Sequence, residues 1–190
     1  GWTVDTPAAG TDQIKAGVTR KSFTMIRHFE ELQAADKPYY IYRGVEINSM
    51  QLTIPANGMI TGTFSVIGKS QTLAGDLTAL GTPTYPPEST TEPMDSFTGS
   101  LDEGGSTIAV VTEVTLDLQN GIEPRFVVGS KDTIRPSDSR SNLTGTVTAY
   151  FENSTLVEKF INETASNLTL TLPDNAGNEI KIKIPNIKYT

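Results

Sequence analysis

Residues 48–70 have the sequence NSMQLTIPANGMITGTFSVIGKS, and no charged side chain occurs between Asn48 and Gly68. Apolar and small polar residues alternate on both sides of Asn57-Gly58, a dipeptide that tight β-hairpin turns prefer. In a strand this alternation places one face on a core and the other face outside it. The stretch therefore predicts a neutral β-hairpin, whose Thr/Ser face meets water, another copy of the chain or a ligand.

The same two-residue period recurs farther along the chain. Val110 to Gln119 alternate in this way and end at the turn pair Asn120-Gly121, which predicts a second hairpin. The apolar positions of 168–172 and 180–184 flank the turn sequence PDNAGN and predict a third. Further strands are expected at 21–29, 39–47, 126–129 and 143–151. The pattern is that of a mainly β protein.

One segment has helical periodicity instead. Within ENSTLVEKFINETA, apolar residues recur at helical spacing, at Leu156, Val157, Phe160 and Ile161. Asn153 or Ser154 provides an N-cap before them. The sequence predicts one helix over about 153–164, which we expect to cover an open end or one face of the sheets.

Residues 70–107 have a different composition, rich in proline and glycine. Four prolines in this segment exclude a regular element through its middle: Pro83, Pro86, Pro87 and Pro93. A long stretch of this kind in a compact domain serves as a binding or bridging arm, or is a plain disordered loop. The composition is compatible with both, and we call this segment the 70–107 loop.

The length, net charge and cysteine content of the chain restrict the class of protein. A chain of 190 residues suits one domain. The net charge of −7 argues against a nucleic-acid binder held by phosphate contacts and against binding to an anionic membrane surface. Between Lys69 and Arg125 every charged residue is acidic. This run is either a solvated surface or a surface that repels a polyanion. Cysteine is absent, which excludes disulfides and thiolate metal sites.

The motifs of catalysis are missing. The one histidine, His28, has no G-x-S-x-G nucleophile motif beside it, and Asp102-Glu103 lacks calcium-loop spacing. Glu113 and Asp117 share one strand face, which leaves open a paired-carboxylate glycosidase but favours an exposed polar face. We expect no catalytic, cofactor or metal site, and a protein that is not an enzyme.

Neutral strands of this length suggest self-assembly. An unpaired strand edge is a template for another chain, and natural proteins often protect it with lysine. Few lysines protect the strands expected here, and 49–68 carries no charge. We therefore expect strands or arms of one copy to complete another copy.

Several stretches resemble the major tail tube proteins of long, non-contractile-tailed bacteriophages. In the first half these are GVTRKSFTMIRHFEEL and YYIYRGVEINSMQLTIPANGMITGTFSVIGKS. In the second half they are DSFTGSLDEGG, TEVTLDLQNGIEPRFVVGS, RSNLTGTVTAYFENSTLVEKFINET and NEIKIKIPNIKYT. The resemblance extends from about Lys15 to Tyr189. It implies a tail-tube β-sandwich with one flanking helix, in subunits that form stacked hexameric or pseudo-hexameric trimeric rings.

The resemblance also implies roles for particular residues. The candidates for a sheet shared between subunits are Met50, Leu52, Ile54, Thr61, Thr63, Phe64 and Val66. The candidates for an acidic lumen are Glu113 and Asp117. The 70–107 loop is the candidate arm between rings, through Leu77, Leu80, Tyr85, Met94 and Phe97. We expect one domain over 1–190 with an N-terminal linker at 1–14, as the C-terminal part of a longer family member.

The partners follow from the same resemblance. They are other copies of the chain, the tape measure, terminator and tip proteins of the tail, and phage DNA that passes without sticking. The expected location is the virion tail, with the host cytoplasm during assembly and no membrane. The alternative is a receptor- or carbohydrate-binding β-sandwich, an adhesin or virion decoration protein, in which Trp2, Tyr39, Tyr40 and Tyr42 would stack on sugar rings.

Overall fold

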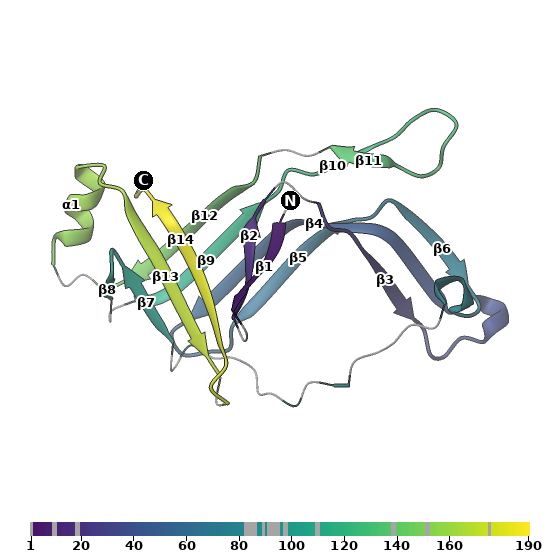
Figure 1. The fold of residues 1–190 in the computed structure, drawn as a ribbon, viewed down its shortest axis with the longest axis horizontal. Coiled ribbons are helices and arrows are strands. Elements are labelled where there is room, and N and C mark those ends of the chain that lie inside the picture. The colour runs from purple at the N-terminus through teal and green to yellow at the C-terminus, as the bar shows by residue number, and fades with distance from the viewer. Residues whose placement is uncertain are drawn as a thin grey trace. The chain divides into compact units, whose positions relative to one another are not determined.

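The computed structural model describes residues 2–8, 11–17, 20–81, 87–88, 90, 96, 99–108, 111–137, 140–150, 153–174 and 176–190. Over these residues the chain is mainly β, with one α-helix and two main antiparallel sheets (Figure 1). This confirms the predicted fold class, a β-sandwich with a flanking helix.

The elements follow one another in a simple order. The strands are β1 (Trp2–Ala8), β2 (Thr11–Ala16), β3 (Phe23–His28), β4 (Tyr39–Pro55), β5 (Thr61–Ile67), β6 (Ser70–Ala74), β7 (Ser100–Glu103), β8 (Ser106–Thr107), β9 (Val111–Gln119), β10 (Glu123–Arg125), β11 (Ile134–Ser137), β12 (Asn142–Ala149), β13 (Ser166–Pro173) and β14 (Glu179–Ile187). The helix α1 spans Thr155–Ile161, and two 3-10 turns lie at η1 (Ala34–Asp36) and η2 (Thr78–Leu80).

The chain groups into two compact units. The first unit comprises Gly1–Ser49, Phe64–Pro86 and Asn120–Ser141, and the second comprises Met50–Thr63, Pro87–Gln119 and Asn142–Thr190. The long strand β4 contributes to both units. The expectation that these units form one domain stays a prediction.

The second unit contains the main hydrophobic core. The larger sheet has the order β12-β9-β4-β3, and β5 and β6 also pair with β4; the other sheet has the order β14-β13-β7-β8. Seven buried residues from the two sheets form one cluster: Ile54, Leu101, Val114, Leu116, Leu168, Leu170 and Leu172. Burial of each such side chain contributes about 1.5–3 kcal/mol. These residues occupy alternate positions of their strands, as the two-residue period predicted.

The first unit is built on the N-terminal half of β4. Its residues Tyr39–Arg43 pair with β6 on one side, and Tyr39–Val45 pair with β3 on the other. Ile41 and Val45 are the most deeply buried side chains there. The short strands β10 and β11 pair with each other.

Two of the predicted hairpins are confirmed. The strands β4 and β5 flank the turn at Asn57-Gly58. The strands β13 and β14 pair in register, with Leu170 opposite Ile182. The predicted helix is also confirmed, although it is shorter than expected and spans Thr155–Ile161. The Asn153 side chain accepts a hydrogen bond from the Thr155 backbone N–H at its start, over 3.0 Å.

The second predicted hairpin is wrong, because β9 pairs with the distant strand β12 rather than with the chain that follows it. The Asn120 side chain explains this. Its Nδ2 donates to the Ile47 carbonyl over 2.9 Å and its Oδ1 accepts from Ser141 Oγ over 2.8 Å. These bonds direct the chain away from β9 after Gly121, whose φ is 59°.

Other boundaries also differ from expectation. The strand predicted at 126–129 is wrong, because this apolar run forms a turn at Gly129 and the strand β10 ends at Arg125. The 70–107 loop contains β6, η2, β7 and β8, so its ends are regular, since they find sheet partners. Residues 1–14, expected as a linker, include β1 and the first part of its partner strand β2.

Candidate assembly surface

The larger sheet has a polar face on the side opposite the core. On β9, Val114, Leu116 and Leu118 are buried, so the residues between them lie on the other face: Glu113, Thr115, Asp117 and Gln119. The register of β12 places threonines beside them on that face: Thr144, Thr146 and Thr148. The result is a threonine-rich surface whose charged groups on these two strands are both carboxylates.

The two predicted lumen acids therefore share this face. Glu113 is exposed, and Asp117 is half-buried and accepts a hydrogen bond from Gln119 Nε2 over 2.6 Å. Four residues along a strand correspond to a separation of about 13 Å. This exceeds the spacing of roughly 5–9.5 Å between the carboxylates of a glycosidase, so the pair does not match that chemistry. Their assignment to a lumen stays a prediction.

Two of the edge strands of the larger sheet, β5 and β12, carry no charge. Among the described residues, β5 has the single sheet neighbour β4, and β12 has the single neighbour β9. Neither strand carries a charged residue. By contrast β14, an edge of the other sheet, carries Lys181, Lys183 and Pro185, which protect an edge against pairing.

The strand β5 is also exposed on both faces. All of Thr61–Val66 is exposed, and Phe64, expected on the core side, is 55% exposed. A neutral edge strand with apolar side chains in water resembles one half of a sheet that another chain completes.

The seven predicted interface residues divide between two strands. Met50, Leu52 and Ile54 lie on β4, which has β5 and β9 as neighbours, and Ile54 belongs to the core. The other four lie on the edge strand: Thr61, Thr63, Phe64 and Val66. A role for any of them between copies stays a prediction.

Part of the predicted inter-ring arm can be located. Leu77 and Leu80 are half-buried at η2. Ser96 Oγ donates to the backbone oxygens of Pro55 and Gly58, which attaches the 70–107 loop to the β4–β5 turn. Tyr85, Met94 and Phe97 lie outside the described residues.

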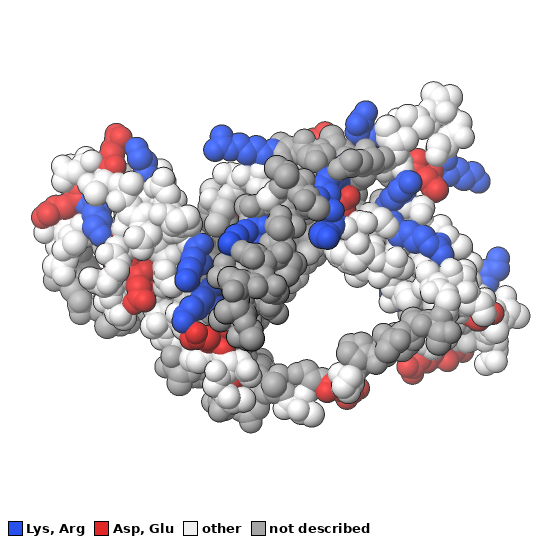
Figure 2. All heavy atoms as spheres, in the orientation of Figure 1, with Lys and Arg blue, Asp and Glu red and all other residues white. Residues whose placement is uncertain are grey.

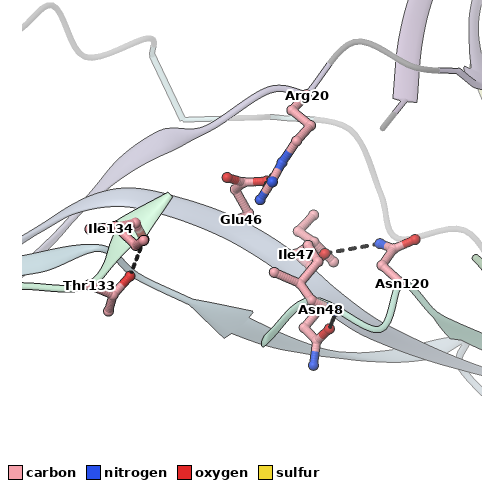
Figure 3. Close-up of polar contacts among 8 residues, drawn as sticks. Arg20, Glu46, Ile47, Asn48, Asn120, Thr133 and Ile134 are labelled. Atoms are coloured by element: carbon pink, nitrogen blue, oxygen red, sulfur yellow. Dashed lines mark hydrogen bonds and ion pairs between the residues drawn. The ribbon is translucent and has the colours of Figure 1, made fainter. Parts of the chain in front are cut away.

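Sequence reasoning missed the buried ion pairs. In the first unit, Arg20 Nη2 lies 2.7 Å from Glu46 Oε2, and both side chains are largely buried. Figure 3 shows this pair together with Asn120, whose side chain points to the Ile47 carbonyl. Arg20 and Glu46 are 26 positions apart in the sequence, and Ile47 and Asn120 are 73 positions apart, so no local pattern could indicate either contact.

A second ion pair joins the helix to the smaller sheet. Lys159 Nζ of α1 donates to Glu103 Oε1 of β7 over 2.7 Å. Burial opposes ionisation of Glu103, but hydrogen bonds from Lys159, Ser166 and Tyr189 bring the net pKa of Glu103 below its ordinary value. Burial, followed by the charge of Glu103, raises the pKa of Tyr189 to about 12. The C-terminal residues and α1 are thus anchored to one carboxylate.

Two of the four aromatic residues considered for sugar binding, Tyr39 and Tyr40, pack against other rings, and the side chain of Trp2 lies outside the described part of the chain. The Tyr39 ring stacks on His28 with centroids 4.3 Å apart, and the Tyr40 ring meets Phe29 edge-on at 5.0 Å. All three tyrosines of 39–42 are half-buried in β4. On the face drawn in Figure 2, charged side chains are scattered over a largely uncharged surface. Tyr39 and Tyr40 therefore offer no open stacking platform.

The described residues contain no cluster of His, Asp or Glu able to hold a metal ion. No helix among them is long and apolar enough to cross a membrane.

The comparisons with known proteins give one clear match. The sequence model of a family described as phage tail tube protein matches residues 2–188, nearly the whole chain. No curated protein matches.

Proposed function

The chain belongs to the phage tail tube protein family, and from this premise we propose that copies of it assemble into stacked rings that form the tube and conduct DNA into the host. The family makes the chain a structural component of the virion tail and suggests a non-enzymatic role. The observation that carries the ring proposal is the pair of neutral edges, β5 and β12, on one sheet.

These two edges suit a head-to-tail contact. If β5 of one copy pairs with β12 of the next, the surfaces in contact differ, and such heterologous contacts generate closed rings when the rotation closes. The backbone N–H and C=O groups of each edge would then be paired in the assembly. Rings of six copies, or of three copies with pseudo-sixfold symmetry, are the form that we propose.

The threonine-rich face then lines the bore. Glu113 and Asp117 give this face negative charge, and no lysine or arginine of β9 or β12 offsets it. Like charge repels the DNA backbone, whereas lysine and arginine would bind phosphate groups. The polar face therefore supports passage of DNA without sticking.

Other contacts complete the proposed tail. The 70–107 loop, attached to the β4–β5 turn through Ser96, contacts the adjacent ring. The ends of the tube contact the tape measure, terminator and tip proteins, and assembly takes place in the host cytoplasm. The alternative of a receptor- or carbohydrate-binding protein is less well supported, because Tyr39 and Tyr40 pack against other rings.

Electron microscopy of the purified chain tests the ring proposal. We expect rings or tubes from the wild type, and their loss in Phe64→Lys, because a lysine protects the β5 edge. Ile180→Lys is the matched control, since Ile180 is 51% exposed and Phe64 is 55% exposed. It lies on β14, which already carries lysines, and should leave the rings intact. A wild type that stays monomeric at high concentration, or rings from Phe64→Lys, would contradict the proposal.

A further inference from the structure

The loop between β10 and β11 presents an apolar tip to solvent. Phe126 is 69% exposed, Val128 is completely exposed, and Val127 between them is also exposed. Three consecutive apolar side chains in water are unusual on a soluble surface unless they meet a partner. We call Phe126–Val128 the apolar tip; Figure 1 shows its loop beyond β10 and β11.

The turn that carries the tip is held in place by hydrogen bonds. The Ser130 N–H donates to the Val127 carbonyl over 3.3 Å, and Ser130 Oγ donates to the Asp132 carbonyl over 2.9 Å. At the base of the loop the buried Thr133 donates its N–H to the Lys69 carbonyl over 3.3 Å. A loop held in its binding conformation loses less entropy when it binds.

The second unit contains a matching pocket of about 390 Å³. Core side chains of both sheets line it, among them Ile54, Leu101, Val114 and Leu170. A cavity of about 150 Å³ already holds one benzene ring, so this pocket has room for a phenyl group and a neighbouring valine. Among its described lining residues, Glu113 is the one charged residue, and strand alternation turns its side chain to the polar face rather than toward the core side chains.

We propose that the apolar tip of one copy inserts into this pocket of another copy. The proposal rests on the proposed self-assembly and assigns one of its contacts. Every copy supplies one tip and one pocket, and because these surfaces differ, the contact is heterologous and can propagate from ring to ring.

Cysteine cross-linking tests the contact directly, because the chain has no cysteine of its own. A Val128→Cys copy is mixed with a size-tagged Thr107→Cys copy; Thr107 is an exposed lining residue of the pocket. A disulfide requires Cβ atoms within about 4.5 Å, so the mixed dimer forms only if the tip enters the pocket of another copy. The control pairs Ile161→Cys, on α1, with the same Thr107→Cys copy.

The expected result is at least a tenfold excess of the mixed dimer over the Ile161 control. Equal yields would overturn the proposal. The double variant Val128→Cys/Thr107→Cys tests whether the tip enters the pocket of its own chain. A cross-link that stays intramolecular at every protein concentration would also overturn the proposal. So would a pocket closed to every added cysteine reagent in Thr107→Cys monomers, since it would then be filled by its own chain.

A second measurement separates this contact from ring formation. Val128→Asp should leave rings visible by electron microscopy while reducing the fraction in stacks at least fivefold. Ile161→Asp, at a site 68% exposed, should stack normally. Tubes of wild-type length from Val128→Asp would overturn the tip contact and leave the proposed function standing, whereas absence of rings from the wild type would remove the proposed function itself.

Discussion

Replacing Lys159 by methionine tests the ion pair that anchors α1. The Glu103 side chain is 5% exposed and that of Lys159 is 24% exposed. Removing one partner of a fully buried pair costs about 3–5 kcal/mol, and the partial exposure of Lys159 lowers this. Because Ser166 and Tyr189 still donate to Glu103, we expect a loss of about 2–3 kcal/mol at pH 7.

The effect should depend on pH in a definite direction. The folded-state pKa of Glu103 lies below its ordinary value of 4.5, so the pair contributes stability above pH 4.5. That contribution is lost as the pH falls through the folded-state pKa. The difference between wild type and Lys159→Met should therefore be largest near neutral pH and shrink below pH 4.5.

Urea unfolding followed by circular dichroism from pH 3 to 8 measures both effects. The matched control is Lys181→Met, because Lys181 also pairs with a glutamate, Glu179, but both side chains are nearly half exposed. Exposed pairs contribute about 0–1 kcal/mol, so this variant should unfold almost as the wild type does. Equal destabilisation by the two variants, or a Lys159→Met effect independent of pH, would refute the assigned anchor.

Three further predictions concern the larger sheet and the polar face. Gly145→Ala should destabilise the chain by about 1–3 kcal/mol in urea, because the added Cβ would lie 2.7 Å from the Thr115 carbonyl oxygen; an unchanged midpoint would contradict the β12–β9 packing. Asn120→Ala should cost about 1–3 kcal/mol, since it removes a buried side-chain amide and its hydrogen bond to the Ile47 carbonyl; thermal unfolding of the variant measures this. Glu113→Lys/Asp117→Lys phage should assemble tubes but eject DNA more slowly, and normal ejection with both sites shown to face outward would retire the lumen assignment.

The Tyr189 hydroxyl provides an alkaline test of the same anchor. Its folded-state pKa of about 12 lies above the ordinary value of 10.0, so its contribution is present below pH 10 and is lost as the pH rises toward 12. Tyr189→Phe should remove this alkaline loss of stability, as followed by urea unfolding at pH 8 to 11. A wild type and variant with parallel alkaline profiles would contradict the Tyr189–Glu103 contact.

Local patterns were sufficient for four of the strands and for the helix. The alternation around Asn57-Gly58 and across 168–184 predicted β4, β5, β13 and β14, because side-chain direction in a strand depends only on parity along the chain. The apolar spacing of Leu156 to Ile161 predicted α1 for the corresponding reason. The same alternation predicted that Glu113 and Asp117 share one face of β9.

The tertiary structure decided which strands pair with one another and which side chains are covered. The strand β9 pairs with β12 rather than with the segment that follows it, and Asn120, directly after β9, bonds Ile47, far away in the sequence. Likewise Phe64 alternates as a core residue would but lies in water. Alternation along a strand fixes which face of the sheet a side chain occupies. Its hydrogen-bond partner, and the surface that covers it, belong to distant segments of the chain that only folding brings close.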